Sequence, residues 1–119
     1  MQIQINAADP HVRNLDVELV KAEVHNALDR FTPQITRVEV HLKDTNGPKA
    51  GNDKQCTIEA RLAGLPPMAV TADAADIPTA VSSAAAKLER LIEHDLDKRR
   101  SQRQRPHDPD GLPGTVESA

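Results

Sequence analysis

The side chains in this sequence that could act as nucleophiles, bases or metal ligands are one cysteine, five histidines and 18 carboxylates. A nucleophilic cysteine needs a nearby base and access to solvent, and a zinc site needs closely spaced cysteines and histidines. Cys56 alternates with Ile58 on the apolar side of its segment, so we interpret it as a small buried hydrophobic residue. No two histidines are spaced i, i+4, and no pocket is indicated around the carboxylates. The sequence therefore predicts no catalytic residue, no metal site, no cofactor and no small-molecule substrate.

The polar segment from Asp44 to Lys54 contains glycines, asparagines and aspartates, as ligand-binding loops do. It lacks the Gly-Lys-Ser/Thr ending of a phosphate-binding loop. It also fails as a calcium loop, because its glycine is misplaced and Gln55 stands where such a loop has a bidentate glutamate. We interpret the segment as a connector between two strands. A loop that touches a partner through Lys49 and Lys54 is the alternative.

Positive charge is concentrated near the C-terminus, while the rest of the chain is acidic. The sequence holds 15 lysines and arginines against 18 aspartates and glutamates. The basic segment, residues 98–105, contains no acidic residue and carries Lys98, Arg99, Arg100, Arg103 and Arg105. A general nucleic-acid binder neutralises phosphates over a broad surface, so RNA binding by this chain must use localised charge. The basic segment is either an RNA-contacting arm or a solvated helix end whose cations suit the helix dipole.

Apolar periodicity predicts four strands and two helices. Alternation typical of strands occurs in four ranges: Gln2–Ile5, Ile35–Leu42, Cys56–Leu62 and Met68–Ala72. Apolar residues spaced three and four apart mark a first helix, which begins after Asn14 and ends at Thr32 before a proline. A second helix begins at Asp76 and ends either near Leu96 or at Arg105. In the longer form it spans about 43 Å, against about 27 Å for an eight-residue strand, so its basic end projects beyond the sheet.

The order β-α-β-β-β-α predicts the α+β class, as a two-layer sandwich with both helices on one face of a four-stranded sheet. Three consecutive strands with short links form an antiparallel meander, and the first strand joins it through a crossover. The other face of the sheet is then open to water. It presents Gln2, Gln4, Arg37, Glu39, His41, Thr57, Glu59 and Arg61. Because this face has no aromatic residue, it cannot read single-stranded RNA by base stacking, and we expect its charges to pair across strands.

Composition indicates a soluble chain with one domain. A single cysteine cannot form an internal disulfide, which fits a reducing compartment. No apolar run approaches the roughly 20 residues of a membrane span, and the N-terminus lacks the order of a signal peptide. We therefore expect a cytoplasmic protein with one α+β domain over residues 1–105. Residues 106–119, which are rich in proline and glycine, are expected to form a disordered tail.

Four segments, in their order and spacing, are similar to those of a known family. They are Leu28-Asp29-Arg30-Phe31, Ile35-Thr36-Arg37-Val38-Glu39-Val40, Asp76-Ile77-Pro78-Thr79-Ala80-Val81 and Lys87-Leu88-Glu89-Arg90. With the order of elements, they resemble the short, single-domain ribosome hibernation-promoting factors, also called ribosome-associated inhibitors or sigma-factor modulation proteins. The likeness covers roughly residues 1–97. The chain departs from the family at Pro78, where an aromatic residue is usual, and in the region around Asp95, where members are often lysine-rich.

The resemblance implies a domain that sits in the cleft of the small ribosomal subunit, where it blocks the mRNA and tRNA sites and protects idle ribosomes. Basic side chains of the family contact ribosomal RNA. By matching position, the implied contacts are Lys87 and Arg90 on the second helix, Arg30 on the first helix and Arg37 on the second strand. The basic segment adds Lys98, Arg99, Arg100, Arg103 and Arg105 as candidates that approach from another direction.

Two other functions stay open at this point. The first is a protein-interaction module of the same fold that has lost ribosome binding and pairs with another protein or with itself as a homodimer. An acidic body and an alanine-rich second helix suit such a module. The second is a small hydrolase or redox enzyme, which would require a clustered pocket of histidine, cysteine or acidic side chains, for example Cys56 exposed beside His41.

Overall fold

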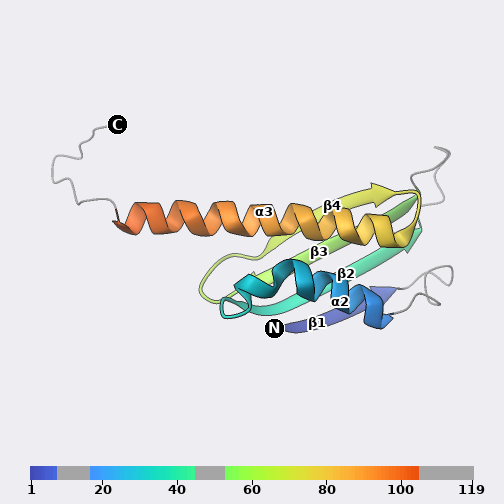
Figure 1. Ribbon diagram of the computed structural model, residues 1–119, viewed down its shortest axis with the longest axis horizontal. Helices are drawn as coiled ribbons and strands as arrows, with labels where there is room; N and C mark the ends of the chain where they lie inside the picture. The colour runs from blue at the N-terminus through green and yellow to red at the C-terminus, as the bar shows by residue number, and fades with distance from the viewer. Residues whose placement is uncertain (8–16, 45–52, 105–119) are drawn as a thin grey trace.

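The computed structural model describes residues 1–7, 17–44 and 53–104, with the side chains of these ranges as far as Ser101. The elements are β1 (Gln2–Ala7), α2 (Val17–Leu28), the short 3-10 helix η1 (Asp29–Phe31), β2 (Ile35–Asp44), β3 (Lys54–Leu62), β4 (Met68–Ala74) and α3 (Ile77–Gln104). Figure 1 shows the two helices side by side over one face of the sheet. The predicted order of elements and the α+β class are confirmed.

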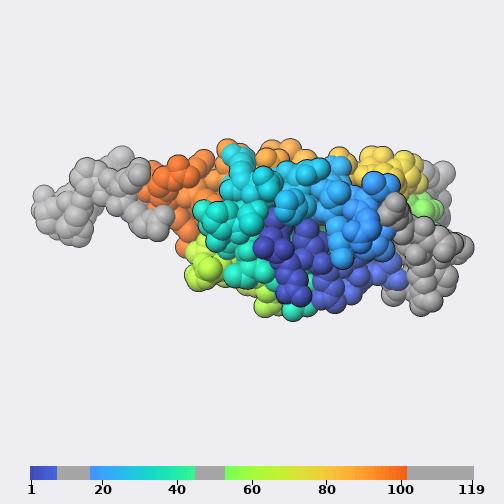
Figure 2. Space-filling view, turned by 60° about the horizontal axis from the view of Figure 1, so that its bottom comes forward, coloured from blue at the N-terminus to red at the C-terminus, as the bar shows by residue number. Residues whose placement is uncertain are grey.

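The sheet has the strand order β1-β2-β3-β4. Strands β2, β3 and β4 form an antiparallel meander, and β1 lies parallel to β2 with Ile3 opposite Val38 and Ile5 opposite Val40. A parallel neighbour requires a crossover connection, and α2 lies on that crossover. The two edges of the sheet are therefore β1 and β4, and Figure 2 shows β1 at the surface beside α2.

The core lies between the sheet and the helices, because every second strand residue points toward the helical layer. The largest fully buried side chains are Leu28, Ile58, Leu88, Ile92, Val24, Val38, Val40, Val81 and Cys56. Phe31, the only aromatic residue of the chain, is 7 % exposed and closes the core beyond the end of α2. The small side chains of Ala80, Ala84 and Ala85 are buried on α3, and they let this helix approach β3 and β4 closely.

Helix α3 begins at a capped N-terminus and extends past the sheet. The backbone N–H of Thr79 donates to Asp76 Oδ1 at 2.8 Å, and Pro78 occupies a first-turn position where no backbone donor is needed. With 28 residues, α3 is about 42 Å long. Its buried stripe ends at Ile92, Leu96 is partly buried, and Figure 1 shows the final turns projecting beyond the strands. The longer of the two predicted ends is therefore correct as far as Gln104.

The strands extend beyond the ends that alternation predicts. Strand β1 reaches Ala7 and β4 reaches Ala74. Strands β2 and β3 are extended by Asp44 and Lys54, which lie opposite each other and form an ion pair of 3.3 Å. Charged residues at a strand end hide its apolar pattern, which explains the short prediction.

Several sequence predictions fall outside the described residues: the cap at Asn14, most of the connector between β2 and β3, Arg105 and the tail of residues 106–119. Within the described ranges, no helix combines the length and the apolar character needed to cross a membrane.

Candidate functional site

The open sheet face carries charges that pair along the strands. Opposite positions of β2 and β3 hold like charges, since Arg37 faces Arg61 and Glu39 faces Glu59. The ion pairs form within each strand: Arg37 Nη2 lies 2.9 Å from Glu39 Oε2, and Arg61 Nη2 lies 3.9 Å from Glu59 Oε1. Arg37 also donates to Gln4 of β1. The expected cross-strand charge pairing is therefore wrong, and Arg37, a predicted RNA contact, is engaged by its neighbours on the sheet.

Arg30, the predicted RNA contact at the end of α2, lies in η1 and is held by two carboxylates of α3. Its Nη2 lies 3.0 Å from Glu93 Oε1 and 3.4 Å from Glu89 Oε2. Its guanidinium carbon lies 4.6 Å from the centroid of the Phe31 ring. The pKa of Arg30 is raised, chiefly by the hydrogen bond with Glu93. Arg30 thus links the two helices, and it must give up these carboxylates before it can contact a phosphate.

The projecting end of α3 contains ion pairs within the helix. Arg99 Nε lies 2.8 Å from Asp95 Oδ2, and Arg100 Nη2 lies 3.0 Å from Asp97 Oδ1. Such i, i+4 and i, i+3 pairs stabilise an exposed helix only modestly. Lys98 is exposed and makes no ion pair with the described part of the chain. Two predicted contacts of the basic segment are thus neutralised locally, whereas Lys98 is not.

The remaining members of the basic segment are only partly placed. Arg103 lies on the last turn of α3, but its side chain is outside the described set, and Arg105 lies outside it entirely.

One side of α3 carries basic residues that form no ion pair with any carboxylate of the described residues. Spaced by three and four residues, Lys87, Leu91, His94 and Lys98 share the side of the helix that faces β4. Lys87 fixes this orientation, because its Nζ donates to the backbone carbonyl oxygen of Thr71 in β4 at 3.0 Å. Arg90 lies next to this stripe, and like His94 and Lys98 it is exposed and makes no ion pair with any described residue. We call the side that carries Lys87, Arg90 and Lys98 the cationic side of α3, and His94 lies on it.

His94 on α3 and Lys43 on β2 are exposed basic residues that were not among the predicted contacts. His94 follows Lys87 by seven residues, and this spacing already places both on one side of a helix. Lys43 continues the alternation of Arg37, Glu39 and His41 on the open sheet face, but the predicted strand stopped before it. The periodicity of the sequence indicates the position of both residues, but charge clustering alone does not identify them.

Cys56 is fully buried in β3, and burial raises the pKa of its thiol to about 12. It lies opposite Leu42, whereas His41 lies opposite Thr57, so the cysteine and the histidine point to opposite faces of the sheet. The arrangement that an enzyme with a Cys56–His41 pair would need is therefore not formed. Among the described residues, no group of three or more histidine, cysteine, aspartate and glutamate side chains is placed to bind a metal.

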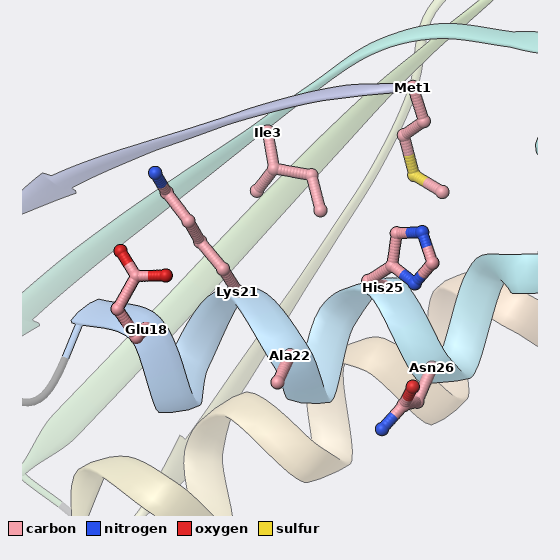
Figure 3. A pocket seen from close by; sticks show the side chains of 7 residues that line it. All are labelled: Met1, Ile3, Glu18, Lys21, Ala22, His25 and Asn26. Atoms are coloured by element: carbon pink, nitrogen blue, oxygen red, sulfur yellow. The ribbon is translucent and has the colours of Figure 1, made fainter.

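A groove of about 440 Å³ separates β1 from α2. Figure 3 shows Met1 and Ile3 pointing toward the helix, and Lys21 and His25 pointing back toward the strand. Glu18 lies in the first turn of the helix at one end of the groove. Helix α2 therefore leaves part of the inner face of β1 uncovered. We call this feature the β1–α2 groove.

The chain was compared with known proteins by sequence and by structure. The model of the family described as sigma 54 modulation protein / S30EA ribosomal protein matches residues 9–100. No curated protein sequence matches.

Two solved structures share the fold. The crystal structure of the Thermus thermophilus Protein Y N-terminal domain has a TM-score of 0.62 and 20% identity, with 79% of this chain and 98% of that chain covered. A ribosomal subunit interface protein from Coxiella burnetii has a TM-score of 0.61 and 18% identity, with 82% of this chain and 99% of that chain covered. Since the family model spans most of the chain, including α2, β2, β3, β4 and most of α3, the chain belongs to the sigma 54 modulation protein / S30EA ribosomal protein family.

Proposed function

We propose that this chain binds the small ribosomal subunit, occupies the space needed by mRNA and tRNA, and stops translation without a chemical step. Membership of a family named for a ribosomal protein supports a ribosomal partner, as does the likeness to a ribosomal subunit interface protein. We propose a cytoplasmic location on the same ground, since that is where the protein would meet ribosomes.

The observation that carries this proposal is the cationic side of α3. Arg90 and Lys98 are exposed and have no carboxylate partner among the described residues. They can therefore neutralise phosphates of ribosomal RNA and release the counterions bound there. Arg30, Arg99 and Arg100 are paired with carboxylates, so each of them exchanges one partner for another when it binds RNA and contributes less.

The test is co-sedimentation with small ribosomal subunits over a range of salt concentrations. We expect binding to weaken steeply as salt rises. Because Arg90→Gln and Lys98→Gln each remove one charge that neutralises a phosphate, each should make the slope of log affinity against log salt shallower by about 1. Lys43→Gln is the matched control, because Lys43 is an exposed lysine on the open sheet face, away from α3.

Binding that does not depend on salt, no binding at low salt, or equal slopes for the three variants would contradict the proposal. Occlusion has its own readout: subunits loaded beforehand with mRNA and tRNA should retain less of the protein than empty subunits do.

A protein-interaction module remains a second candidate, because several basic residues are already neutralised by Glu89, Glu93, Asp95 and Asp97. If the chain has lost its ribosome site, Lys87→Glu and Arg90→Glu together leave partner capture unchanged. If it has kept that site, the same pair of substitutions abolishes ribosome association.

A further inference from the structure

The two edges of the sheet differ in how they are protected. Strand β4 is preceded by two prolines, and Lys87 Nζ binds the carbonyl oxygen of Thr71 in this strand. Strand β1 lacks these kinds of protection, because Gln2–Ala7 contains no charged residue and no proline. Edge strands that lack charge and proline are templates for pairing with another strand. Within the described ranges, β1 is therefore the edge of the sheet that lacks such protection.

The β1–α2 groove makes this edge incomplete on its inner side as well. Ile3 and Ile5 point toward the helical layer, but both are only partly buried, unlike the valines that lie opposite them in β2. The space-filling view shows β1 along the surface with α2 next to it (Figure 2). A further strand beside β1 would cover apolar surface that α2 leaves exposed.

We propose that β1 pairs antiparallel with β1 of a second copy of this chain, around a two-fold axis that passes beside Gln4. A two-fold interface brings the same surface of both copies together. In this register Ile3 lies opposite Ile5 of the second copy, and Gln2 lies opposite Asn6 of the second copy. Apolar residues thus meet on the inner face and amides meet on the open face. A shift by one residue would set apolar side chains against polar ones.

We assign the strand that pairs with β1 to a second copy of this chain, because both the charge of the strand and the spacing of the helices are compatible with such a dimer. The strand is uncharged, so two copies meet there without repulsion. The two helices of one copy cover four strands, which corresponds to about 10 Å of sheet per helix. If the sheet continues into a second copy, the two α2 helices lie at a similar separation. This separation suits helix packing.

Charge complementarity extends to the rim of the β1–α2 groove. Helix α2 runs antiparallel to β1 (Figure 1), so the axis brings the first turns of the two α2 helices side by side. Glu18 and Lys21 both lie on the groove side of this turn (Figure 3). Glu18 of each copy then faces Lys21 of the other. The cationic side of α3 flanks the opposite edge of the sheet and stays exposed in this dimer.

Cysteine cross-linking of the full chain tests the register. Residues directly opposite in an antiparallel pair have Cα atoms about 4.5–5.5 Å apart, within the range that a disulfide bridges. We expect Gln4→Cys to form a covalent dimer rapidly under mild oxidation. Thr71→Cys is the matched control, since Thr71 is exposed at the middle of the other edge strand. Cys56 is buried and does not compete.

Sedimentation velocity across a dilution series tests the unlinked protein. We expect a monomer–dimer equilibrium that Gln4→Glu weakens, because two carboxylates then lie opposite each other at the axis, while Thr71→Glu leaves it unchanged. Gln4→Glu keeps a partner for Arg37, so folding is retained. We also expect Lys21→Glu to weaken the dimer and the double variant Glu18→Lys with Lys21→Glu to restore it.

The proposal is overturned by a monomer at every concentration, by cross-linking at Thr71→Cys as fast as at Gln4→Cys, or by equal effects of the two glutamate variants. A disulfide-free monomer of Gln4→Cys that still binds ribosomes would reject the dimer and leave the ribosomal function intact.

Discussion

At the scale of single residues, arginines of the same chain differ in what they can offer a partner. Arg30 is bound by Glu89 and Glu93 and stacks on Phe31. Arg90 has none of these partners, although Glu89 and Glu93 lie close to it on the same helix. An arginine that is already paired must exchange one partner for another when it binds, so its net contribution is small. Recognition by this protein should therefore depend on Arg90 and Lys98 more than on Arg30.

The pKa of Asp76 also depends on the surroundings of its side chain. Its carboxylate accepts a hydrogen bond from the backbone N–H of Thr79, and this bond lowers the pKa of Asp76 below its ordinary value. A group whose pKa is lowered by folding stabilises the folded state above its unfolded pKa. That stabilisation is lost as the pH falls through the lowered pKa of the folded state.

We expect Asp76→Ala to lower the melting temperature at neutral pH, because α3 loses its cap. The difference from the unmodified protein should shrink once the pH falls below about 3.9, the ordinary pKa of aspartate, and on through the lowered pKa of Asp76. Thermal unfolding followed by circular dichroism at neutral and acidic pH checks this. A deficit that is the same at both pH values would mean that the charge of Asp76 plays no part.

At the scale of elements, α3 holds the fold together by one stripe. Leu88 is fully buried among the strands and α2, whereas Leu91, less than one turn further on, is 38% exposed. We expect Leu88→Ala to cost about 2–5 kcal/mol in free energy of unfolding, because it removes buried apolar volume and leaves a cavity. Leu91→Ala should cost well under half of that. Urea denaturation measures both, and equal costs would show that the stripe is misassigned.

Elements also show what the sequence could and could not predict. Alternation located β2 and β3, because Val38, Val40 and Ile58 must all point into one core. The sequence did not predict the polar ends of these strands at Asp44 and Lys54. The ion pair between them forms only because the register of β2 and β3 places the two residues opposite each other. The predicted pairing of charges across strands on the open face was wrong for the same reason, since the register decides which charges lie opposite.

At the scale of the whole molecule, the distribution of charge matters more than its sum. The chain has a net charge of −3, yet the side of α3 toward α2 is acidic and the side toward β4 is cationic. The sequence indicated that positive charge had to be localised. The charge pattern pointed to the basic segment, and the family resemblance pointed to Lys87 and Arg90. The fold places Lys87, Arg90 and Lys98 on neighbouring positions of one side of α3, because helical periodicity aligns them. Glu89 and Glu93 bind Arg30 and not Arg90, and this long-range contact between η1 and α3 is not contained in any local sequence pattern.

The projecting end of α3 has a further consequence for how the protein is degraded. Beyond Leu96 the helix has no sheet beneath it, so its hydrogen bonds can open without disturbing the core. We expect limited trypsin digestion to cut within the basic segment before it cuts at Lys87 or Arg90, and to leave a stable fragment with the melting temperature of the intact chain. Mass spectrometry of the early products checks this, and first cuts at Lys87 or Arg90 would contradict it. A protease could thus trim the arm from an otherwise intact domain and remove part of its positive charge.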